Sequence, residues 1–347
     1  MRKTPLLTQE ADVGLVHERL AADVRRYLTL EPRQLPSRYL YDPLGSALFE
    51  AICRLPWYRI TRAELGLLEA HGREVFEAAG RLANIVELGP GSGEKLATLI
   101  GAARRGAPAA KAQASSPLDL HLVDVSAAAL EVARKTLGGL DAVQVIAHEA
   151  SYETGLRDVM RRIEGGGADE RPFRPRSPRT LVLFLGSNIG NFDPPAAQTF
   201  LRGVRAALTR DDLLLLGVDL VKPEAELLAA YDDPLGVTAA FNRNLLSRIN
   251  RELGGNFDLR RFAHRAVWNP AESRIEMHLV SLERQRVRVP AIALSFTLAA
   301  GEFIWTESSY KFEPDDIGRR LEAAGFSAVR QWVNEEDRFA LTLVKAG

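Results

Sequence analysis

Apolar residues along this chain follow two patterns, and the change between them divides the sequence. Between residues 84 and 218, short apolar runs such as Leu120–Val123 and Thr180–Leu185 alternate with stretches of helical spacing. Continuous apolar runs of this length are typical of parallel strands that are buried on both faces. From residue 263 onward, apolar and polar positions alternate instead, which predicts antiparallel strands. The pattern therefore predicts a parallel α/β sheet and a separate α+β region.

Further elements are predicted from local spacing and turn residues. Residues 62–79 have helical spacing, with Thr61 as the predicted N-cap and Glu64 at the capping-box position. Stretches rich in turn-forming residues predict loop insertions at 102–118 and 164–179. The other predicted helices are Leu15–Leu28, Leu130–Leu137, Glu224–Tyr231, Val237–Leu253 and Pro314–Ala324, and the other predicted strands are Val143–Ala147, Leu213–Val218, Ala263–Trp268, Ser273–Leu282, Val287–Leu294, Ser327–Val333 and Arg338–Val344.

The stretch Asn84–Lys95 predicts a strand, a glycine-rich turn and the start of a helix. Glu87 lies near the carboxyl end of that strand, and the glycines allow a sharp turn and the close approach of a ligand. A dinucleotide fingerprint requires a small residue where this chain has Glu94, and an acid there would face a pyrophosphate. A Walker A loop is excluded because Leu96 stands where Ser or Thr is required.

The remaining pattern, Glu-Leu-Gly-x-Gly-x-Gly, resembles motif I of class I S-adenosylmethionine-dependent methyltransferases. That cofactor carries a sulfonium cation and an amino acid tail but no phosphate. Asp124 ends the next predicted strand, where an acid binds ribose hydroxyls in folds of this kind. A glycine-rich turn that binds no ligand is the alternative interpretation of this stretch alone.

Composition narrows the classes of function. The chain has 347 residues with 45 basic and 45 acidic side chains, so overall charge gives no argument for nucleic acid or an anionic membrane. Cys53 is the only cysteine, which favours a reducing compartment. No apolar run approaches a membrane span or a signal peptide, so a cytoplasmic protein is expected. The 6 histidines have no ligand spacing, and no metal is predicted.

Several segments together resemble one family, the L-histidine Nα-methyltransferases, which form hercynine for ergothioneine biosynthesis. The resemblance covers residues from about 15 to the end of the chain. The segments are Tyr-Asp-Pro-Leu-Gly-Ser-Ala-Leu-Phe (41–49), Leu-Pro-Trp-Tyr-Arg-Ile-Thr-Arg (55–62), Glu-Leu-Gly-Pro-Gly-Ser-Gly-Glu-Lys (87–95), Phe-Leu-Gly-Ser-Asn-Ile-Gly-Asn (184–191), Tyr-Asp-Asp-Pro-Leu-Gly-Val-Thr-Ala-Ala-Phe-Asn-Arg-Asn (231–244) and Thr-Glu-Ser-Ser-Tyr-Lys-Phe (306–312).

The resemblance implies a fold of two parts. The first is a Rossmann-like, doubly wound class I methyltransferase sheet with an antiparallel C-terminal strand pair, formed by residues 61–221 and 312–347. The second is a smaller, discontinuous α+β substrate-binding domain, formed by residues 1–60 and 222–311. Both would contribute residues to the active site. The family also implies a monomer with L-histidine as its small-molecule substrate.

The resemblance also implies substrate contacts. It implies that Tyr58 contacts the substrate, and that Asn191 and Tyr231 hold the α-carboxylate. It further implies that Glu307 and Ser309 hold the imidazole. Residues i and i+2 of an extended segment share a face, so this last pair could reach a single ring. The further positions implied are Gly186 and Asn188 near the α-amine, and Phe241 and Met277 in the pocket wall.

For S-adenosylmethionine, the implied contacts are Tyr41, Gly89, Gly91, Lys95 and Asp124. The sequence departs from the family at the adenine site, where an Asp-Phe pair is usual and His148-Glu149-Ala150-Ser151-Tyr152 stands instead. Glu149 is the predicted replacement for the aspartate. No residue is assigned as a general base, and positioning by Gly186 and Asn188 is expected to assist the reaction.

Two alternatives remain open at this stage. The first is an N-methyltransferase of the same fold that acts on a different amino acid or amine. The second is a non-catalytic cofactor-binding protein. The motif residues Gly89, Gly91, Asp124 and Asn191 favour an enzyme over the second alternative.

Overall fold

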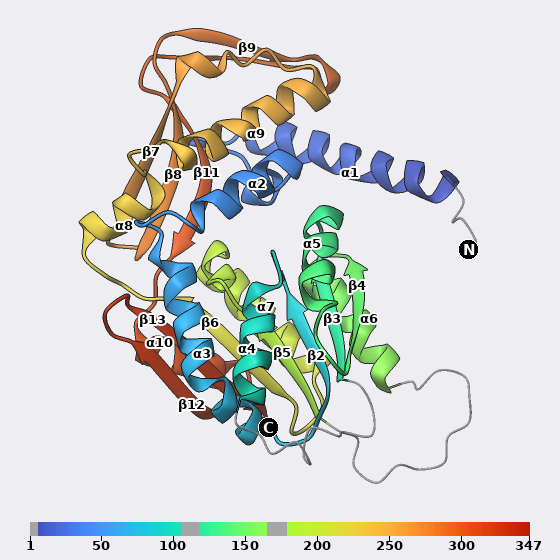
Figure 1. Cartoon of the computed structure of the whole chain (residues 1–347). Coiled ribbons are helices and arrows are strands. Elements are labelled where there is room, and N and C mark those ends of the chain that lie inside the picture. Colours follow the sequence, from blue (N-terminus) through green and yellow to red (C-terminus); the bar gives the residue numbers. More distant parts are fainter. Residues whose placement is uncertain (1–5, 106–117, 165–178) are drawn as a thin grey trace. The chain divides into compact units, whose positions relative to one another are not determined.

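The computed structural model describes residues 6–105, 118–164 and 179–347 (Figure 1). The chain divides into a smaller unit, residues 1–58 and 223–309, and a larger unit, residues 59–222 and 310–347. Most of both predicted loop insertions, 102–118 and 164–179, lies outside the described residues. At their edges the structure is regular, because helix α4 continues to Arg104 and strand β3 already begins at Leu118.

The described part of the larger unit contains a seven-stranded sheet with the order β12-β13-β6-β5-β2-β3-β4. Strands β2 to β6 are parallel, and β13 runs antiparallel to both β6 and β12. This is the class I methyltransferase topology, so the predicted fold class is confirmed. The strands are β2 (Leu82–Leu88), β3 (Leu118–Asp124), β4 (Val143–Glu149), β5 (Arg179–Phe184), β6 (Leu213–Asp219), β12 (Phe326–Asn334) and β13 (Phe339–Ala346).

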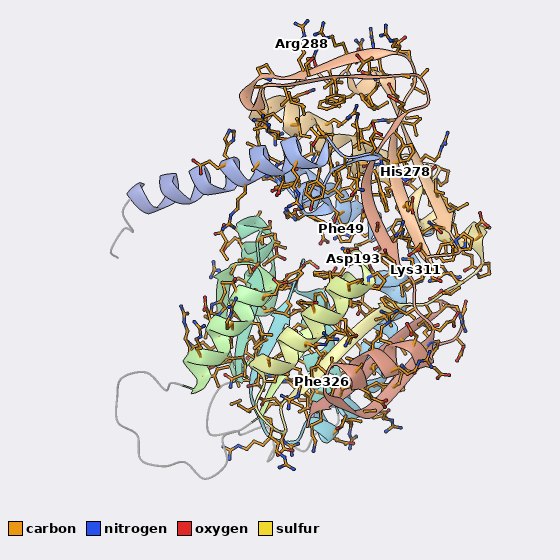
Figure 2. The ribbon with its side chains drawn as sticks, turned by 180° about the vertical axis from the view of Figure 1, so that it is seen from behind. Phe49, Asp193, His278, Arg288, Lys311 and Phe326 are labelled. Carbon is orange, nitrogen blue, oxygen red and sulfur yellow. The ribbon has the colours of Figure 1, made fainter. Side chains whose placement is uncertain are left out.

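Helices cover both faces of this sheet (Figure 1). On one face lie α3 (Arg59–Ala79), α4 (Glu94–Arg104) and α5 (Ala127–Leu137). On the other lie α6 (Tyr152–Glu164), α7 (Pro194–Ala207) and α10 (Pro314–Ala323), which bury an apolar core around Phe184 and Phe200. In Figure 2, Asp193 marks the N-cap of α7 and Phe326 the start of β12. The sheet is therefore buried on both faces, as its apolar strands require.

The predicted start of α3 is wrong. The helix begins at Arg59, so Thr61 lies inside it and Glu64 does not complete a capping box. Glu64 is fully buried, and its carboxylate binds Lys95 and the backbone N–H of Gly186 instead. A carboxylate removed from water needs a cation and hydrogen-bond donors, and here they come from elements distant in the sequence.

The chain leaves the larger unit after Lys222 and returns to it at Tyr310. A buried ion cluster joins the two segments. Asp219 ends β6, and its carboxylate lies 2.7 Å from Lys222 Nζ and 3.0 Å from Lys311 Nζ. Backbone hydrogen bonds from Val221 to Phe312 and from Phe312 to Asp219 run beside these pairs. The chain is thus tied to the end of β6 at both positions.

The smaller unit contains a sheet with the order β1-β11-β8-β7 and a separate ribbon of β9 and β10. The helices α8 and α9 have the bounds that the sequence predicts. The unit's elements are α1 (Leu6–Tyr27), β1 (Arg33–Gln34), η1 (Ser37–Leu40), α2 (Pro43–Ile52), α8 (Glu224–Tyr231), α9 (Val237–Leu253), η4 (Leu259–Arg261), β7 (Phe262–Asn269), β8 (Arg274–Ser281), β9 (Gln285–Val289), η5 (Pro290–Ile292), β10 (Leu294–Leu298) and β11 (Phe303–Tyr310).

The predicted strand Val287–Leu294 is also wrong. Strand β9 ends at Val289, because Pro290 begins a 3-10 turn and cannot donate a ladder hydrogen bond. The chain then reverses, and β10 pairs with β9 instead of with the larger sheet. Arg288 lies on this ribbon (Figure 2) and is exposed.

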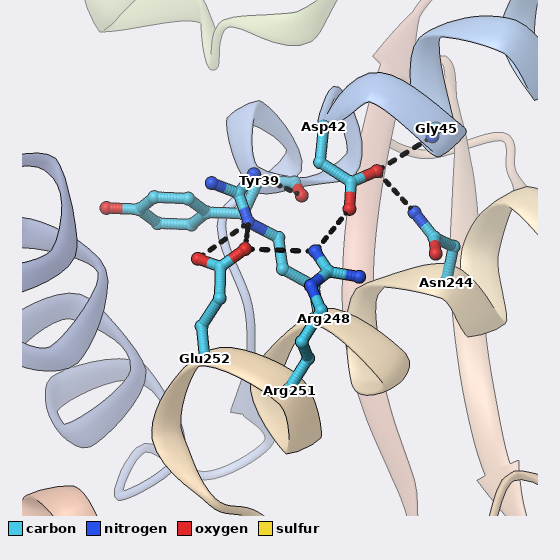
Figure 3. Close-up of polar contacts among 7 residues, drawn as sticks. All are labelled: Tyr39, Asp42, Gly45, Asn244, Arg248, Arg251 and Glu252. Atoms are coloured by element: carbon cyan, nitrogen blue, oxygen red, sulfur yellow. Dashed lines mark hydrogen bonds and ion pairs between the residues drawn. The ribbon is translucent and has the colours of Figure 1, made fainter. Parts of the chain in front are cut away.

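A buried carboxylate joins α2 to α9 in the smaller unit (Figure 3). Asp42 caps α2 by accepting the Gly45 N–H at 2.8 Å. It also accepts hydrogen bonds from Asn244 Nδ2 and Arg251 Nη2, both at 2.7 Å. Burial alone would raise the pKa of Asp42, but the hydrogen bonds from Gly45 and Arg251 hold it below its usual value. The segment around Tyr41 is therefore attached to α9 by an ionised side chain.

We expect Asp42→Ala to lower the free energy of unfolding by about 2–3 kcal/mol, because it removes a helix cap, the acceptor of the buried Asn244 amide and the ion pair with Arg251. Chemical denaturation at neutral pH measures the loss. The matched control is Asp193→Ala, which removes an exposed N-cap whose carboxylate accepts one backbone N–H and should cost about 1 kcal/mol. Equal losses in the two variants would contradict this account.

Candidate functional site

Acidic residues end three neighbouring strands of the larger unit. Glu87 lies near the end of β2, while Asp124 and Glu149 end β3 and β4 and are partners in register. Because the strands are parallel, these residues lie along one edge of the sheet. Glu149 is thus the last residue of a strand, although the sequence placed it after the strand, and its side chain is exposed.

Glu87 has an unusual environment. It is 1% exposed, and neither carboxylate oxygen has a hydrogen-bond partner among the described residues. Burial raises the pKa of Glu87 to about 8, although the charge of Lys95 opposes the shift. Burial also raises the pKa of Asp124, whose carboxylate accepts the Ser126 N–H at 2.8 Å. A buried carboxylate without a donor suits a cationic or hydrogen-bonding ligand.

The glycine-rich turn has left-handed backbone at each of its three glycines, with φ of 75° at Gly89, 54° at Gly91 and 77° at Gly93. At Gly89, a Cβ atom would lie 2.9 Å from both Asn188 Nδ2 and Tyr152 Oη. Any larger residue would therefore be strained and would also collide with two side chains. The turn brings Asn188 and Tyr152 beside the end of β2.

Lys95 and Gly186, both predicted site residues, are brought together by a third residue. Lys95 Nζ lies 2.7 Å from Glu64 Oε2, and the Gly186 N–H donates to both carboxylate oxygens at 2.9 Å. A Cβ atom on Gly186 would lie 2.9 Å from Lys95 Nζ. The sequence analysis missed the role of Glu64, because its position three residues after Thr61 indicated a local helix cap.

Asn188 and Asn191 lie on a single 3-10 turn, η3 (Asn188–Asn191), that follows β5. The turn is anchored by Ser187, whose buried Oγ accepts the Asp219 N–H at 2.9 Å. Asn188 is half-buried and Asn191 is exposed. Together with Gly186, the predicted residues of this turn lie at the same sheet edge as the acids of β2, β3 and β4.

In the smaller unit, a hydrogen bond joins two of the predicted substrate residues. Tyr231 Oη and Ser309 Oγ are 2.8 Å apart, and both residues are buried. The Tyr58 ring meets the Tyr231 ring edge-on, with centroids 6.1 Å apart. Burial raises the pKa of Tyr58 well above its usual value, so its phenol stays protonated at neutral pH. The hydroxyls of Tyr231 and Ser309 and the ring of Tyr58 thus belong to one buried group of side chains.

Strand β11 carries the predicted ring-binding pair. Glu307 and Ser309 are two residues apart on a regular strand and so share one face. Glu307 is half-buried. Thr306 directly precedes Glu307, and its hydroxyl donates a hydrogen bond to the carbonyl of Met277 on β8 at 2.9 Å. Met277 itself is 1% exposed, so it belongs to the packed interior of the unit.

An aromatic cluster connects Tyr41, Tyr58 and Phe241. Tyr41 packs against Phe241 with ring centroids 5.5 Å apart. Phe49 lies against Tyr41 at 5.5 Å, Phe241 at 5.9 Å and Tyr58 at 6.2 Å. The sequence analysis did not assign Phe49 a place, although it ends the first quoted segment. The cluster sets the orientation of the tyrosine rings.

His264 was also missed, and it positions Tyr231. Its Nε2 lies 2.7 Å from the Tyr231 carbonyl, and its Nδ1 lies 2.9 Å from Asn242 Nδ2. The amide of Asn242 can only donate through its nitrogen, so Nδ1 accepts and Nε2–H donates to the carbonyl. Burial lowers the pKa of His264, despite the opposing bond to Tyr231. A neutral imidazole therefore holds the end of α8.

The predicted site residues of the two units suit different kinds of ligand. The larger unit presents acids and backbone groups at the sheet edge, which suits a ligand with a positive charge and hydroxyls rather than a phosphate. The smaller unit presents a carboxylate and hydroxyls beside aromatic rings, which suits a small polar ring. Within residues 6–105, 118–164 and 179–347, no group of three or more acidic, histidine or cysteine side chains is arranged to hold a metal ion. In the same residues, no helix is long and apolar enough to cross a membrane.

Comparison with known proteins gives consistent matches along the chain. A family model described as histidine-specific methyltransferase, SAM-dependent, matches residues 20–346. The chain is 42% identical to histidine N-alpha-methyltransferase of Mycobacterium tuberculosis over 94% of this chain and 95% of that protein. It is 40% identical to the protein of the same name from Mycolicibacterium smegmatis, over 94% of each chain. It is 27% identical to ergothioneine biosynthesis protein 1 of Neurospora crassa, over 87% of this chain and 32% of that protein.

We expect His264 to make stability depend on pH. A histidine whose pKa is lowered in the folded state binds its proton more readily when unfolded, so stability falls as the pH drops through about 6.5. Thermal denaturation between pH 8 and pH 5 should therefore show a smaller acid-induced loss for His264→Gln than for the unmodified protein. His17→Gln, at an exposed position, should leave the loss unchanged, and an equal effect of both variants would refute the assignment.

Proposed function

This chain belongs to the family of histidine-specific, S-adenosylmethionine-dependent methyltransferases, and we propose that it trimethylates the α-amino group of L-histidine. The product is hercynine, and the reaction is the first step of ergothioneine biosynthesis. Two relatives named histidine N-alpha-methyltransferase match nearly the whole chain. The structural observation that carries the proposal is the buried hydrogen bond between Tyr231 of α8 and Ser309 of β11, the strand that also carries Glu307.

The residues of the larger unit fit the cofactor. S-Adenosylmethionine, when bound, supplies an electrophilic methyl group on a sulfonium cation. Glu87, whose carboxyl oxygens have no hydrogen-bond partner among the described residues, would ionise beside the cationic amino acid end of the cofactor and hold it, and Asp124 would bind the ribose hydroxyls. Gly89 and Gly91 leave room for the approach of the cofactor to the backbone. Lys95 and Tyr41 are the further proposed contacts, with Glu149 at the adenine.

The residues of the smaller unit account for selection of the imidazole. Glu307 and Ser309 together offer a negative acceptor and a hydroxyl, which can bond both ring nitrogens. Phenylalanine or leucine could not return these bonds, and their binding would leave polar groups buried without partners. Phe241 and Met277 would form the apolar wall. This pairing of charge and hydroxyl favours histidine over other amino acids.

The α-carboxylate and α-amine have separate proposed contacts. Tyr231 and Asn191 would hold the carboxylate, Tyr58 would contact the substrate, and Gly186 and Asn188 would place the amine. An ammonium has no lone pair, so the amine must be neutral before it attacks. No side chain is assigned as the general base. The residues act by orienting the amine and by excluding water.

We assign cofactor binding chiefly to the larger unit and substrate binding chiefly to the smaller one. The assignments are not exclusive, because Tyr41 belongs to the smaller unit while Gly186, Asn188 and Asn191 belong to the larger one. The single cysteine of the chain suits a reducing compartment. We therefore propose that the enzyme acts in the cytoplasm, and the resemblance to the family implies that it acts as a monomer.

The direct test is mass spectrometry of the purified protein with S-adenosylmethionine and each of the twenty common amino acids. A gain of three methyl groups on L-histidine alone is expected. Methylation of another amino acid would overturn the proposed substrate. Cofactor binding without transfer to any of the twenty would overturn the proposed reaction on free amino acids.

We expect Glu307→Gln to lower kcat/KM for L-histidine at least about tenfold, because the ring loses a charge-assisted hydrogen bond. The measurement is initial rate against histidine concentration at saturating cofactor. Glu302→Gln is the matched control, since Glu302 is an exposed glutamate just before β11. A similar loss in both variants would argue against a ring contact.

We expect Tyr231→Phe to raise the KM for histidine about tenfold, because it removes a hydroxyl that would bind a charged carboxylate. It also leaves Ser309 Oγ without the 2.8 Å partner seen in the structure. Comparison with histidinamide, which has no carboxylate, separates the two effects. If the variant loses activity equally on both substrates, Tyr231 does not read the carboxylate.

A further inference from the structure

The carboxylate of Glu64 connects three elements of the larger unit. Glu64 projects from α3 and is fully buried. One of its oxygens lies 2.7 Å from Lys95 Nζ in the first turn of α4. Both oxygens accept the Gly186 N–H, at 2.9 Å, from the turn after β5. Glu64 thus contacts a proposed cofactor residue and a proposed substrate residue at once.

Strand β6 is shaped to receive this carboxylate. A Cβ atom on Gly217 would lie only 2.0 Å from Glu64 Oε1. Gly217 interrupts an otherwise apolar, fully buried strand, where a glycine weakens the strand unless another group needs the space. The missing side chain is therefore explained by the carboxylate that occupies its place.

We propose that Glu64 is a positioning residue for methyl transfer, which fixes Lys95 and the Gly186 turn in the geometry that cofactor and amine require. Lys95 is only half-buried, but its partner Glu64 is fully buried, so removing the lysine from the carboxylate would leave a buried charge without its cation. The bifurcated hydrogen bond from the Gly186 N–H to both carboxylate oxygens likewise restricts the Gly186 turn. The part of the proposal that concerns the amine rests on the proposed function, whereas the part that concerns the cofactor does not.

Asp212 offers a matched control within the same unit. It is also a buried carboxylate that accepts backbone N–H groups, from Thr180 at 2.8 Å and from Thr209 at 2.9 Å. These contacts lie before β6 and at the start of β5, at the end of the strands opposite to Gly186. Asp212→Asn therefore perturbs a comparable contact without touching the proposed site.

The experiment is calorimetric titration of S-adenosylhomocysteine into Glu64→Gln, Asp212→Asn and the unmodified protein, with melting temperatures measured in parallel. Glutamine keeps an acceptor for Gly186 but removes the charge that holds Lys95. We expect Glu64→Gln to weaken binding about tenfold or more. Asp212→Asn should lower the melting temperature while leaving the affinity unchanged. No histidine is present, so a wrong substrate assignment does not affect this test.

Coupling to Lys95 is tested by a double variant. If Glu64 acts through Lys95, then Glu64→Gln combined with Lys95→Met should bind no more weakly than Lys95→Met alone. Additive losses would overturn the coupling. The steady-state kcat of Glu64→Gln, on whichever amino acid the mass spectrometry identifies, should fall at saturating cofactor, and an unchanged kcat would overturn the effect on the amine.

A second variant keeps the proposal testable if Glu64→Gln does not fold. Gly217→Ala places a methyl group where the carboxylate lies and should displace it, weakening S-adenosylhomocysteine binding in the same direction. Unchanged affinity in this variant would overturn the proposal. So would a loss of affinity in Asp212→Asn as large as that in Glu64→Gln, because the effect would then follow general stability.

Discussion

The larger unit depends on the neutralisation of one buried carboxylate. Glu64 has no access to water, so its charge must be met by a cation and by backbone donors. Lys95 and the Gly186 N–H meet it, which joins α3, α4 and the end of β5. The same requirement explains the glycine at position 217. The pairing of a single charge therefore connects α3 to the strand ends at which ligand binding is proposed.

In the smaller unit, buried polar groups are likewise paired, by several separate contacts instead of one. The Tyr231 hydroxyl is satisfied by Ser309, and its carbonyl by the neutral ring of His264. Asp42 is satisfied by a helix end, an amide and a guanidinium. Each of these buried groups finds its partner on another element, so the side chains proposed to bind substrate are oriented before any ligand arrives. Such preorganisation reduces the cost of binding.

Much of the architecture could be predicted from the chain alone. The class I fold, the methyltransferase class, the family and the cofactor were predicted from the apolar runs and six motifs, and they are confirmed. The substrate and cofactor contacts stay predictions. Two predictions were wrong. Thr61 and Glu64 matched the pattern of a helix cap, although Glu64 pairs with residues distant in the sequence, and Pro290 ended a strand that was predicted to continue.

The sequence by itself determined the order and type of the elements, because the spacing of apolar residues and the positions of glycine and proline act over a few residues. It also determined which residues match the family. Only the tertiary structure decided that Glu64 binds Lys95 and Gly186, that Phe49 links three aromatic rings, and that His264 holds Tyr231. These contacts join residues far apart in the chain, and burial makes their pairing obligatory once the fold has formed.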